Sequence, residues 1–228
     1  MNLNPERPTR RYTHPSDRTA DVAVTPVLIP EEVDALCLPG NMILTETKRE
    51  ELNIGIGDEI FIIGLFSFLK GRTRNIPVSR TGNIAMFPDE GIPVQDHRGQ
   101  RTEIDGIVIE ARSIGGLSGS PVLARHSFNI EGFRHKETST PLIVTAYGSQ
   151  FHLLGLVLSH WDADPTAFNQ PEPKMIRGGV NFGLAVVVPA SKLMETLQCE
   201  ALSQMRTAAA KLEAEKQKKQ AGGASIDA

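Results

Sequence analysis

Cysteine is scarce in this chain, and long apolar runs are absent. Only Cys37 and Cys199 occur among the 228 residues, which argues against a disulfide framework and fits a reducing compartment. The apolar runs are too short to span a bilayer, and residues 1–18 lack the apolar segment of a secretory signal peptide. We therefore expect a cytoplasmic protein without a membrane partner.

The chain also lacks a strong excess of either charge. Its 24 lysines and arginines against 27 aspartates and glutamates leave a formal net charge of −3 at pH 7, which gives no support for nucleic acid as the main partner. A hydrophobic fraction of 40% and a mean hydropathy of −0.18 are typical of a globular protein. The length suits one medium domain or two small ones.

Helical periodicity is almost absent before residue 189, whereas short β-rich runs alternate with glycine and proline turns. The expected strands are Asp21–Val27, Glu59–Leu65, Ile84–Phe87, Ile104–Ala111, Pro121–Ala124, Leu142–Thr145, Leu153–Leu158 and Val180–Val188. Short strands at this spacing predict an all-β protein, either an antiparallel barrel or a sandwich.

The C-terminal region has the helical period that the rest of the chain lacks. Apolar residues recur at three- and four-residue intervals after Pro189, which predicts one long helix over 189–220 with Ser191 as its N-cap. A pair of glycines ends this helix, and we expect residues 221–228 to be disordered. A coiled-coil seam on the helix surface is the alternative interpretation.

The stretch Gly116-Leu117-Ser118-Gly119-Ser120-Pro121-Val122 carries the clearest chemical signal. Glycines allow a loop to point consecutive backbone N–H groups at one spot, as the stabilisation of an oxyanion requires. The central serine is then a candidate nucleophile. A hydroxyl is a weak nucleophile until a neighbouring base accepts its proton, so this hypothesis also requires a base.

Five stretches, in chain order, resemble segments of the chymotrypsin-like serine proteases, including the HtrA-type and trypsin-like peptidase domains. They are His14-Pro15 with Asp21–Val24, Gly57–Gly64, Gly116–Val122, Leu156–Trp161 and Gly179–Ala185. Together they cover roughly residues 12–200. Each stretch alone is weakly specific, and their common order is the stronger argument.

The resemblance implies a chymotrypsin-like antiparallel β-barrel fold with a complete second barrel, a partial first barrel and a C-terminal α-helix. Residues 1–28 would be the remnant of the first barrel, 29–53 the linker, and 54–188 the second barrel with the nucleophile loop. A remnant of this kind exposes apolar side chains and an unpaired strand edge. We therefore expect self-association through that face or through the C-terminal helix.

The resemblance also implies catalytic roles. Ser118 would be the nucleophile, the amides of Gly116 and Ser118 would form the oxyanion hole, and Asp21 would orient the base. Leu117 replaces the aspartate or asparagine of many relatives and removes the activation salt bridge of the secreted enzymes.

A substrate pocket is implied in the same way. Ser159, His160 and Trp161 would border it, and Arg112 lies where the family sets the chemistry of the pocket floor. With His160 nearby, a cation at Arg112 would favour an acidic substrate side chain. The implied partner is a protein or peptide substrate, with no metal or cofactor.

The base histidine of the family is missing. Only His14 precedes Asp21, and its position seven residues earlier leaves no room for the intervening strands, so we interpret His14 as an exposed loop residue. Loss of a triad base costs on the order of 10⁶ in turnover. The expected function is thus a truncated serine endopeptidase domain, inactive or weakly active. A non-enzymatic pseudoprotease that binds peptides is the alternative, and a wrongly assigned start codon on an intact protease gene is a third explanation.

Two other serine hydrolase folds fit less well. An α/β-hydrolase needs a glycine where Ser120 stands, a helix that Pro121 would interrupt, and an acid followed by a histidine after Ser118. A subtilisin-like order of Asp21, His97 and Ser118 is formally allowed. That fold, however, needs alternating strands and helices that the chain lacks.

A zinc site is a further hypothesis with weaker support. It would need His152 and His160, eight residues apart around one apolar strand, to converge with Asp162 and Asp164. The two histidines of the polar insertion 125–140 are expected to be solvated.

Overall fold

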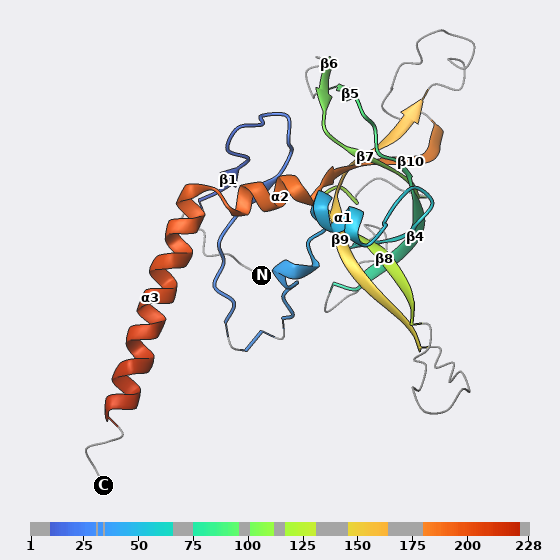
Figure 1. Cartoon of the computed structure of the whole chain (residues 1–228). Helices are drawn as coiled ribbons and strands as arrows, with labels where there is room; N and C mark the ends of the chain where they lie inside the picture. The colour runs from blue at the N-terminus through green and yellow to red at the C-terminus, as the bar shows by residue number, and fades with distance from the viewer. Residues whose placement is uncertain are drawn as a thin grey trace, which may run out of the picture.

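A closed barrel of six antiparallel strands forms the centre of the computed structural model, which describes residues 10–30, 32–33, 35–65, 75–95, 101–111, 117–130, 146–163 and 180–223 (Figure 1). Around the barrel the strands follow the order β10-β7-β4-β3-β8-β9. Their bounds are β3 Glu59–Leu65, β4 Pro77–Met86, β7 Ile107–Ala111, β8 Pro121–Ile130, β9 Ala146–Ala163 and β10 Val180–Pro189. The expected antiparallel barrel is confirmed, and its chymotrypsin-like identity stays a prediction.

Two small sheets and four helical segments accompany the barrel. The sheets pair β1 with β2 and β5 with β6, and α3 extends away from the barrel (Figure 1). The bounds are β1 Tyr12–Thr13, β2 Ala23–Val24, β5 Ile92–Gln95, β6 Arg101–Ile104, the 3-10 helix η1 Gly40–Met42, α1 Glu46–Glu51, α2 Ala190–Leu197 and α3 Glu200–Gly223.

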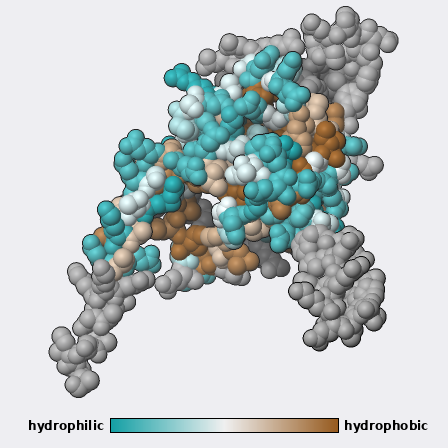
Figure 2. Space-filling view, in the orientation of Figure 1, coloured by the Kyte–Doolittle hydropathy of each residue, from teal (hydrophilic) through white to brown (hydrophobic). Residues whose placement is uncertain are grey.

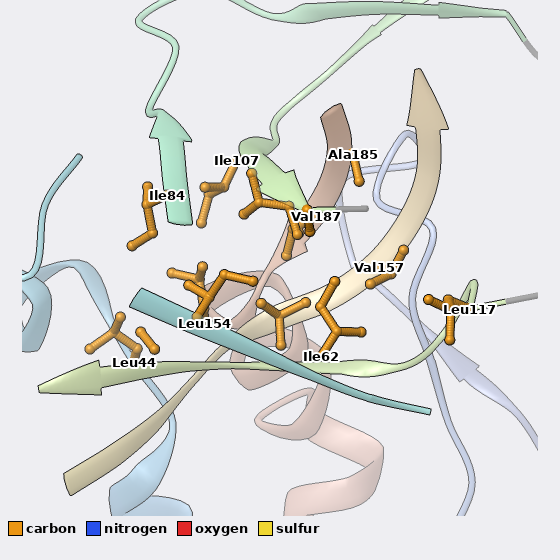
Figure 3. Close-up of a cluster of buried hydrophobic side chains, with 14 of the residues drawn as sticks. Leu44, Ile62, Ile84, Ile107, Leu117, Leu154, Val157, Ala185 and Val187 are labelled. Carbon is orange, nitrogen blue, oxygen red and sulfur yellow. The ribbon is translucent and has the colours of Figure 1, made fainter. Parts of the chain in front are cut away.

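The barrel interior is filled by aliphatic side chains at alternate strand positions. Ile60 and Ile62 of β3 are fully buried, as are Val122 and Ala124 of β8 and Ile109 of β7. Figure 3 shows these strands converging on one cluster, to which β10 contributes Ala185 and Val187. Burying a side chain of this size stabilises the fold by roughly 1.5–3 kcal/mol, so the alternating pattern accounts for barrel closure.

Residues on both sides of α1 cover one end of the barrel, which we call the α1 end. Leu44 and Ile54 join the barrel core there, and the Thr45 side chain caps α1 by accepting the Lys48 amide at 3.3 Å. Two backbone hydrogen bonds join the residues before β3 to the end of β4: the Asp58 carbonyl accepts the amide of Ile84 at 2.9 Å, and the Gly57 amide donates to the Ile84 carbonyl at 2.8 Å. The α1 end is therefore where β3 begins and β4 ends.

The observed strand limits differ from the predicted ones where the pairing of two strands continues through polar residues. The predicted strand Glu59–Leu65 coincides with β3. In contrast, β8 continues past Ala124 because it pairs with β9 as far as Ile130, which lies opposite Ala146. Cross-strand hydrogen bonds continue the ladder through the polar residues Arg125, His126 and Ser127. The predicted strand 142–145 lies outside the described residues.

Two helices replace the single predicted C-terminal helix. α2 begins after Pro189, its N-cap residue, and no side chain caps it, so the predicted cap at Ser191 is wrong. Apolar residues of α2, among them Leu193, pack with Leu153 of β9. In α3, Leu202 is the one buried residue between positions 200 and 215. The apolar face therefore ends soon after α2, and α3 leaves the barrel.

The short helix α1 is absent from the sequence-based expectation, which treats residues 29–53 as a connecting segment. Its six residues contain no buried side chain. Amphipathic periodicity therefore cannot reveal it. The Thr45 cap is the local signal that favours a helix start here.

The N-terminal segment is attached to α2 by buried and charged contacts. His14 is buried, which corrects its interpretation as an exposed loop residue. Its Nδ1 accepts the Asp17 amide at 2.9 Å, so Nε2–H donates to Glu195 Oε2 at 2.8 Å. The ammonium of Lys192 lies 2.9 Å from Asp17 Oδ2 and 2.8 Å from Asp105 Oδ2, just before β7.

This anchoring predicts acid sensitivity. Hydrogen bonds from the Thr19 hydroxyl and the Lys192 ammonium hold the pKa of Asp17 well below its usual range. A lowered pKa in the folded state gives stability that is complete above about pH 4 and is lost as the pH falls further. We expect Asp17→Asn to cost about 0.5–1 kcal/mol at pH 7 and to flatten the loss of thermal stability between pH 4 and pH 2. Asp21→Asn, at an exposed carboxylate, is the matched control. Equal pH profiles for wild type and Asp17→Asn would contradict this role.

Candidate functional site

Ser118 lies in a tight turn that leads directly into β8. The Ser120 amide donates to the Leu117 carbonyl at 2.9 Å, and Gly119 has a φ of +82°, a conformation that favours glycine. Ser118 itself is exposed, whereas Leu117 is 4% exposed and belongs to the barrel core (Figure 3). The turn thus exposes the Ser118 hydroxyl to solvent, while the buried side chain of Leu117 fixes the turn to the barrel core.

Neighbouring strands hold this turn on two sides. The Gly119 amide donates to the Val157 carbonyl of β9 at 2.7 Å, and the Val157 amide donates to the Ser120 carbonyl at 2.9 Å. On the β3 side, a Cβ added at Gly64 would lie 2.3 Å from Ser120 Oγ and 2.8 Å from Leu117 Cδ2. Glycine is therefore required at the end of β3, and we call this opposite mouth of the barrel the serine end.

The hydrogen bonds of the turn's amides bear on the predicted oxyanion hole. The amides of Gly119 and Ser120 donate to backbone carbonyls. Within the ranges that the structure describes, the Ser118 amide donates to no other group, and its oxyanion role stays a prediction. Gly116, the other predicted oxyanion residue, lies outside the described residues.

Two of the predicted pocket residues follow Val157 along β9. Ser159 and His160 are half-buried and pair with Val186 and Ala185 of β10. Trp161 continues β9. Arg112 follows β7 directly and lies outside the described residues. The strand that anchors the serine turn therefore also carries Ser159 and His160.

Asp21 is not joined to this arrangement. It is exposed and precedes β2, whose partners are β1 and α2. In the described part of the chain no hydrogen bond or ion pair links Asp21 to Ser118 or to a histidine. Lys192 joins the same segment to Asp105, which lies before β7 and hence at the α1 end. The orienting role of Asp21 stays a prediction.

Two of the histidines on β8 and β9, His126 and His152, lie too far from Ser118 to supply the base. His126 lies five residues beyond Pro121 along β8, about 17 Å from the serine end at the rise of an extended strand. His152 lies diagonally across from it on β9. His152 is 4% exposed and its ring centroid is 6.5 Å from that of His126. Sequence reasoning missed this pair because only the β8–β9 register brings the two residues together.

The zinc hypothesis does not agree with the strand geometry. His152 and His160 are separated by eight residues of one extended strand, more than about 20 Å, so they cannot share an ion. Asp164 lies outside the described residues. Across the ranges that the structure covers, no group of three or more histidine, cysteine, aspartate or glutamate residues is placed to hold a metal ion.

A group of exposed apolar side chains lies outside the barrel, on residues 27–38. Leu28 is 97% exposed and Leu36 is 99% exposed. Figure 2 shows apolar surface between the barrel and α3, where this segment runs in Figure 1. The expected self-association through the N-terminal region is consistent with this surface and stays a prediction.

Comparison of the chain with known proteins identified no relative. No protein-family model, curated protein or solved structure matches the chain. Among the helices of the described ranges, none is both long and apolar enough to cross a membrane. A function for this barrel has to be argued from its own residues and geometry.

Proposed function

We propose that the barrel is a serine peptidase domain of the trypsin-like type, in which Ser118 is the nucleophile and hydrolysis is slow because the base histidine that the family resemblance places well before Asp21 is missing. The observation that carries this proposal is the turn from Leu117 to Ser120. It holds an exposed hydroxyl at the mouth of a closed antiparallel barrel, next to the Ser118 amide, which donates to no group within the described residues.

The chemistry follows from that turn. Ser118 Oγ attacks the carbonyl carbon of a peptide, and the Ser118 amide, together with that of Gly116, stabilises the negative oxygen. The C–N bond then breaks, the amine leaves with a proton, and water hydrolyses the acyl-enzyme. Without a histidine both proton transfers pass through water, and turnover falls by on the order of 10⁶ relative to a complete triad.

A peptide-binding module without turnover is the second candidate. The placement of His14, His126 and His152 favours it, because the first is bonded to Glu195 and the other two lie at the α1 end. Binding would use the surface bordered by Ser159, His160 and Trp161. With Arg112 it would prefer a peptide that carries an acidic side chain.

A fluorophosphonate probe tests the nucleophile. We expect slow labelling of the wild-type chain, none of Ser118→Ala, and unchanged labelling of Ser149→Ala, which removes an exposed serine on β9. Labelling is measured by intact mass over hours. Labelling that survives Ser118→Ala would contradict the nucleophile assignment, and labelling within seconds would contradict the missing base.

The two candidates differ in turnover and in binding. Fluorescence anisotropy with an acidic peptide and with its lysine-substituted counterpart measures affinity, and mass spectrometry of the same mixture measures cleavage. Binding of the acidic peptide with no Ser118-dependent cleavage would favour the binding module. Cleavage that is lost in Ser118→Ala would favour the slow peptidase.

A further inference from the structure

His152 is a buried polar side chain whose hydrogen-bonding capacity is unused. It is 4% exposed, and within the described part of the chain neither ring nitrogen has a hydrogen-bond partner. A neutral imidazole offers one donor and one acceptor. Leaving a buried polar group unpaired costs about 1–3 kcal/mol, so a bound group that pairs with this ring would stabilise the barrel by an amount of that order.

His126 is the nearest group of matching chemistry. Ala124 pairs with His152 and Gln150 pairs with His126, so the two histidines are diagonal neighbours across the β8–β9 ladder. His126 alternates with Ala124, which is fully buried in the barrel. Their ring centroids are 6.5 Å apart, with 52° between the ring planes. Both imidazoles therefore lie on the inner side of the sheet at the α1 end.

A cavity of about 470 Å³ opens beside this pair. His126, Leu52 and Asn53 line it together with the carboxylates of Asp58 and Glu59. Asp58 accepts the Gly55 amide at 2.8 Å, and Glu59 pairs with Arg125 at 2.9 Å. The cavity gives solutes access to His126. The negative charges of Asp58 and Glu59 partly offset the positive charge of Lys48, which acts on the neighbouring His152.

Both side chains offer imidazole nitrogens as ligands, and their ring centroids are 6.5 Å apart. Neutral imidazole is a good ligand for zinc and copper, whereas magnesium and calcium prefer oxygen ligands.

We propose that His126 and His152 form a two-histidine site for a divalent transition-metal ion such as Zn²⁺ or Cu²⁺ at the α1 end of the barrel. Zinc–nitrogen bonds of 2.0–2.1 Å place two imidazole nitrogens about 3.4 Å apart on a tetrahedral ion, so the two rings, whose centroids are 6.5 Å apart, must approach one another when the ion binds. Since no cluster of three ligating side chains exists among the described residues, water or an exchangeable ligand completes the shell. The site is independent of the proposed peptidase function, because it lies at the opposite mouth of the barrel.

Metal titration of the full chain tests this site. We expect Cu²⁺ to bind with an electron paramagnetic resonance spectrum that shows coupling to two nitrogens, and Zn²⁺ to bind the same site in calorimetry and to be displaced by Cu²⁺. His126→Gln and His152→Gln should each weaken binding at least about tenfold, or 1.4 kcal/mol. His160→Gln on the same strand should leave binding unchanged, and Mg²⁺ in excess should not compete.

The outcomes separate a metal site from a site filled by water. Equal affinity in His126→Gln and wild type, a spectrum with one coupled nitrogen, or no Zn²⁺ binding would each overturn the proposal. Thermal unfolding shows whether His152→Gln is folded. If it is not, the half-buried His126 position decides through His126→Gln alone.

Discussion

Replacing Gly155 with alanine is expected to destabilise the barrel by about 3 kcal/mol or more. At Gly155, β9 pairs with β8 through Val122 and with β10 through Pro189. A Cβ there would lie 2.0 Å from the Val188 carbonyl oxygen and 2.6 Å from Val187 Cγ1. A ladder paired on both sides cannot move its backbone cheaply, so the added methyl group would strain the closure of the barrel.

Thermal unfolding of purified Gly155→Ala measures this effect. For a chain of this size, 3 kcal/mol corresponds to a fall in Tm of roughly 6–12 °C. The matched control is Gly55→Ala, because a Cβ at Gly55 has no neighbour within 4 Å, and its stability should change by less than about 0.5 kcal/mol. Equal Tm values for the two variants would show that β9 and β10 do not approach this closely.

The second large effect is expected at Leu117, which connects the serine turn to the barrel core. Leu117→Ala removes a side chain that is 4% exposed and shares the core cluster with Ile62 and Val157 (Figure 3). The lost burial and the cavity that remains should cost about 2–4 kcal/mol. Because the turn loses its apolar anchor, fluorophosphonate labelling of Ser118 should also slow.

Denaturant unfolding and labelling kinetics on the same preparations check this expectation. Leu28→Ala is the matched control, because Leu28 is 97% exposed and its truncation should change stability by less than about 0.5 kcal/mol. Lower stability with an unchanged labelling rate would mean that Leu117 supports the fold without positioning Ser118. Unchanged stability would contradict its burial.

Part of the fold could be read from local patterns. The apolar run over Glu59–Leu65 predicts β3 with its observed limits. Patterning fails in α1, which has no apolar face, and in β8 beyond Ala124, where pairing with β9 continues the strand through Arg125, His126 and Ser127. It also misses the break after α2, because the loss of packing against β9 ends the apolar face there.

Some features of the candidate site could likewise be predicted from the sequence, and others could not. Ser118 and its flanking glycines were recognisable because a tight turn needs particular residue types at fixed local spacing. The burial of His14 against Glu195, 181 residues away, was not recognisable. Neither was the proximity of His126 and His152, which depends on how β8 pairs with β9.

The sequence by itself determined the all-β character, the barrel expectation and the serine turn, because these depend on the alternation of strands and on the backbone freedom of glycine. Only the tertiary structure decided which groups meet. In the folded barrel, the exposed Ser118 lies next to the buried Leu117 at one mouth, and His126 and His152 lie together at the other. Asp21 lies on a segment that packs against α2. The physical reason is that strand register and helix packing join residues far apart in the chain, and local spacing carries no information on either.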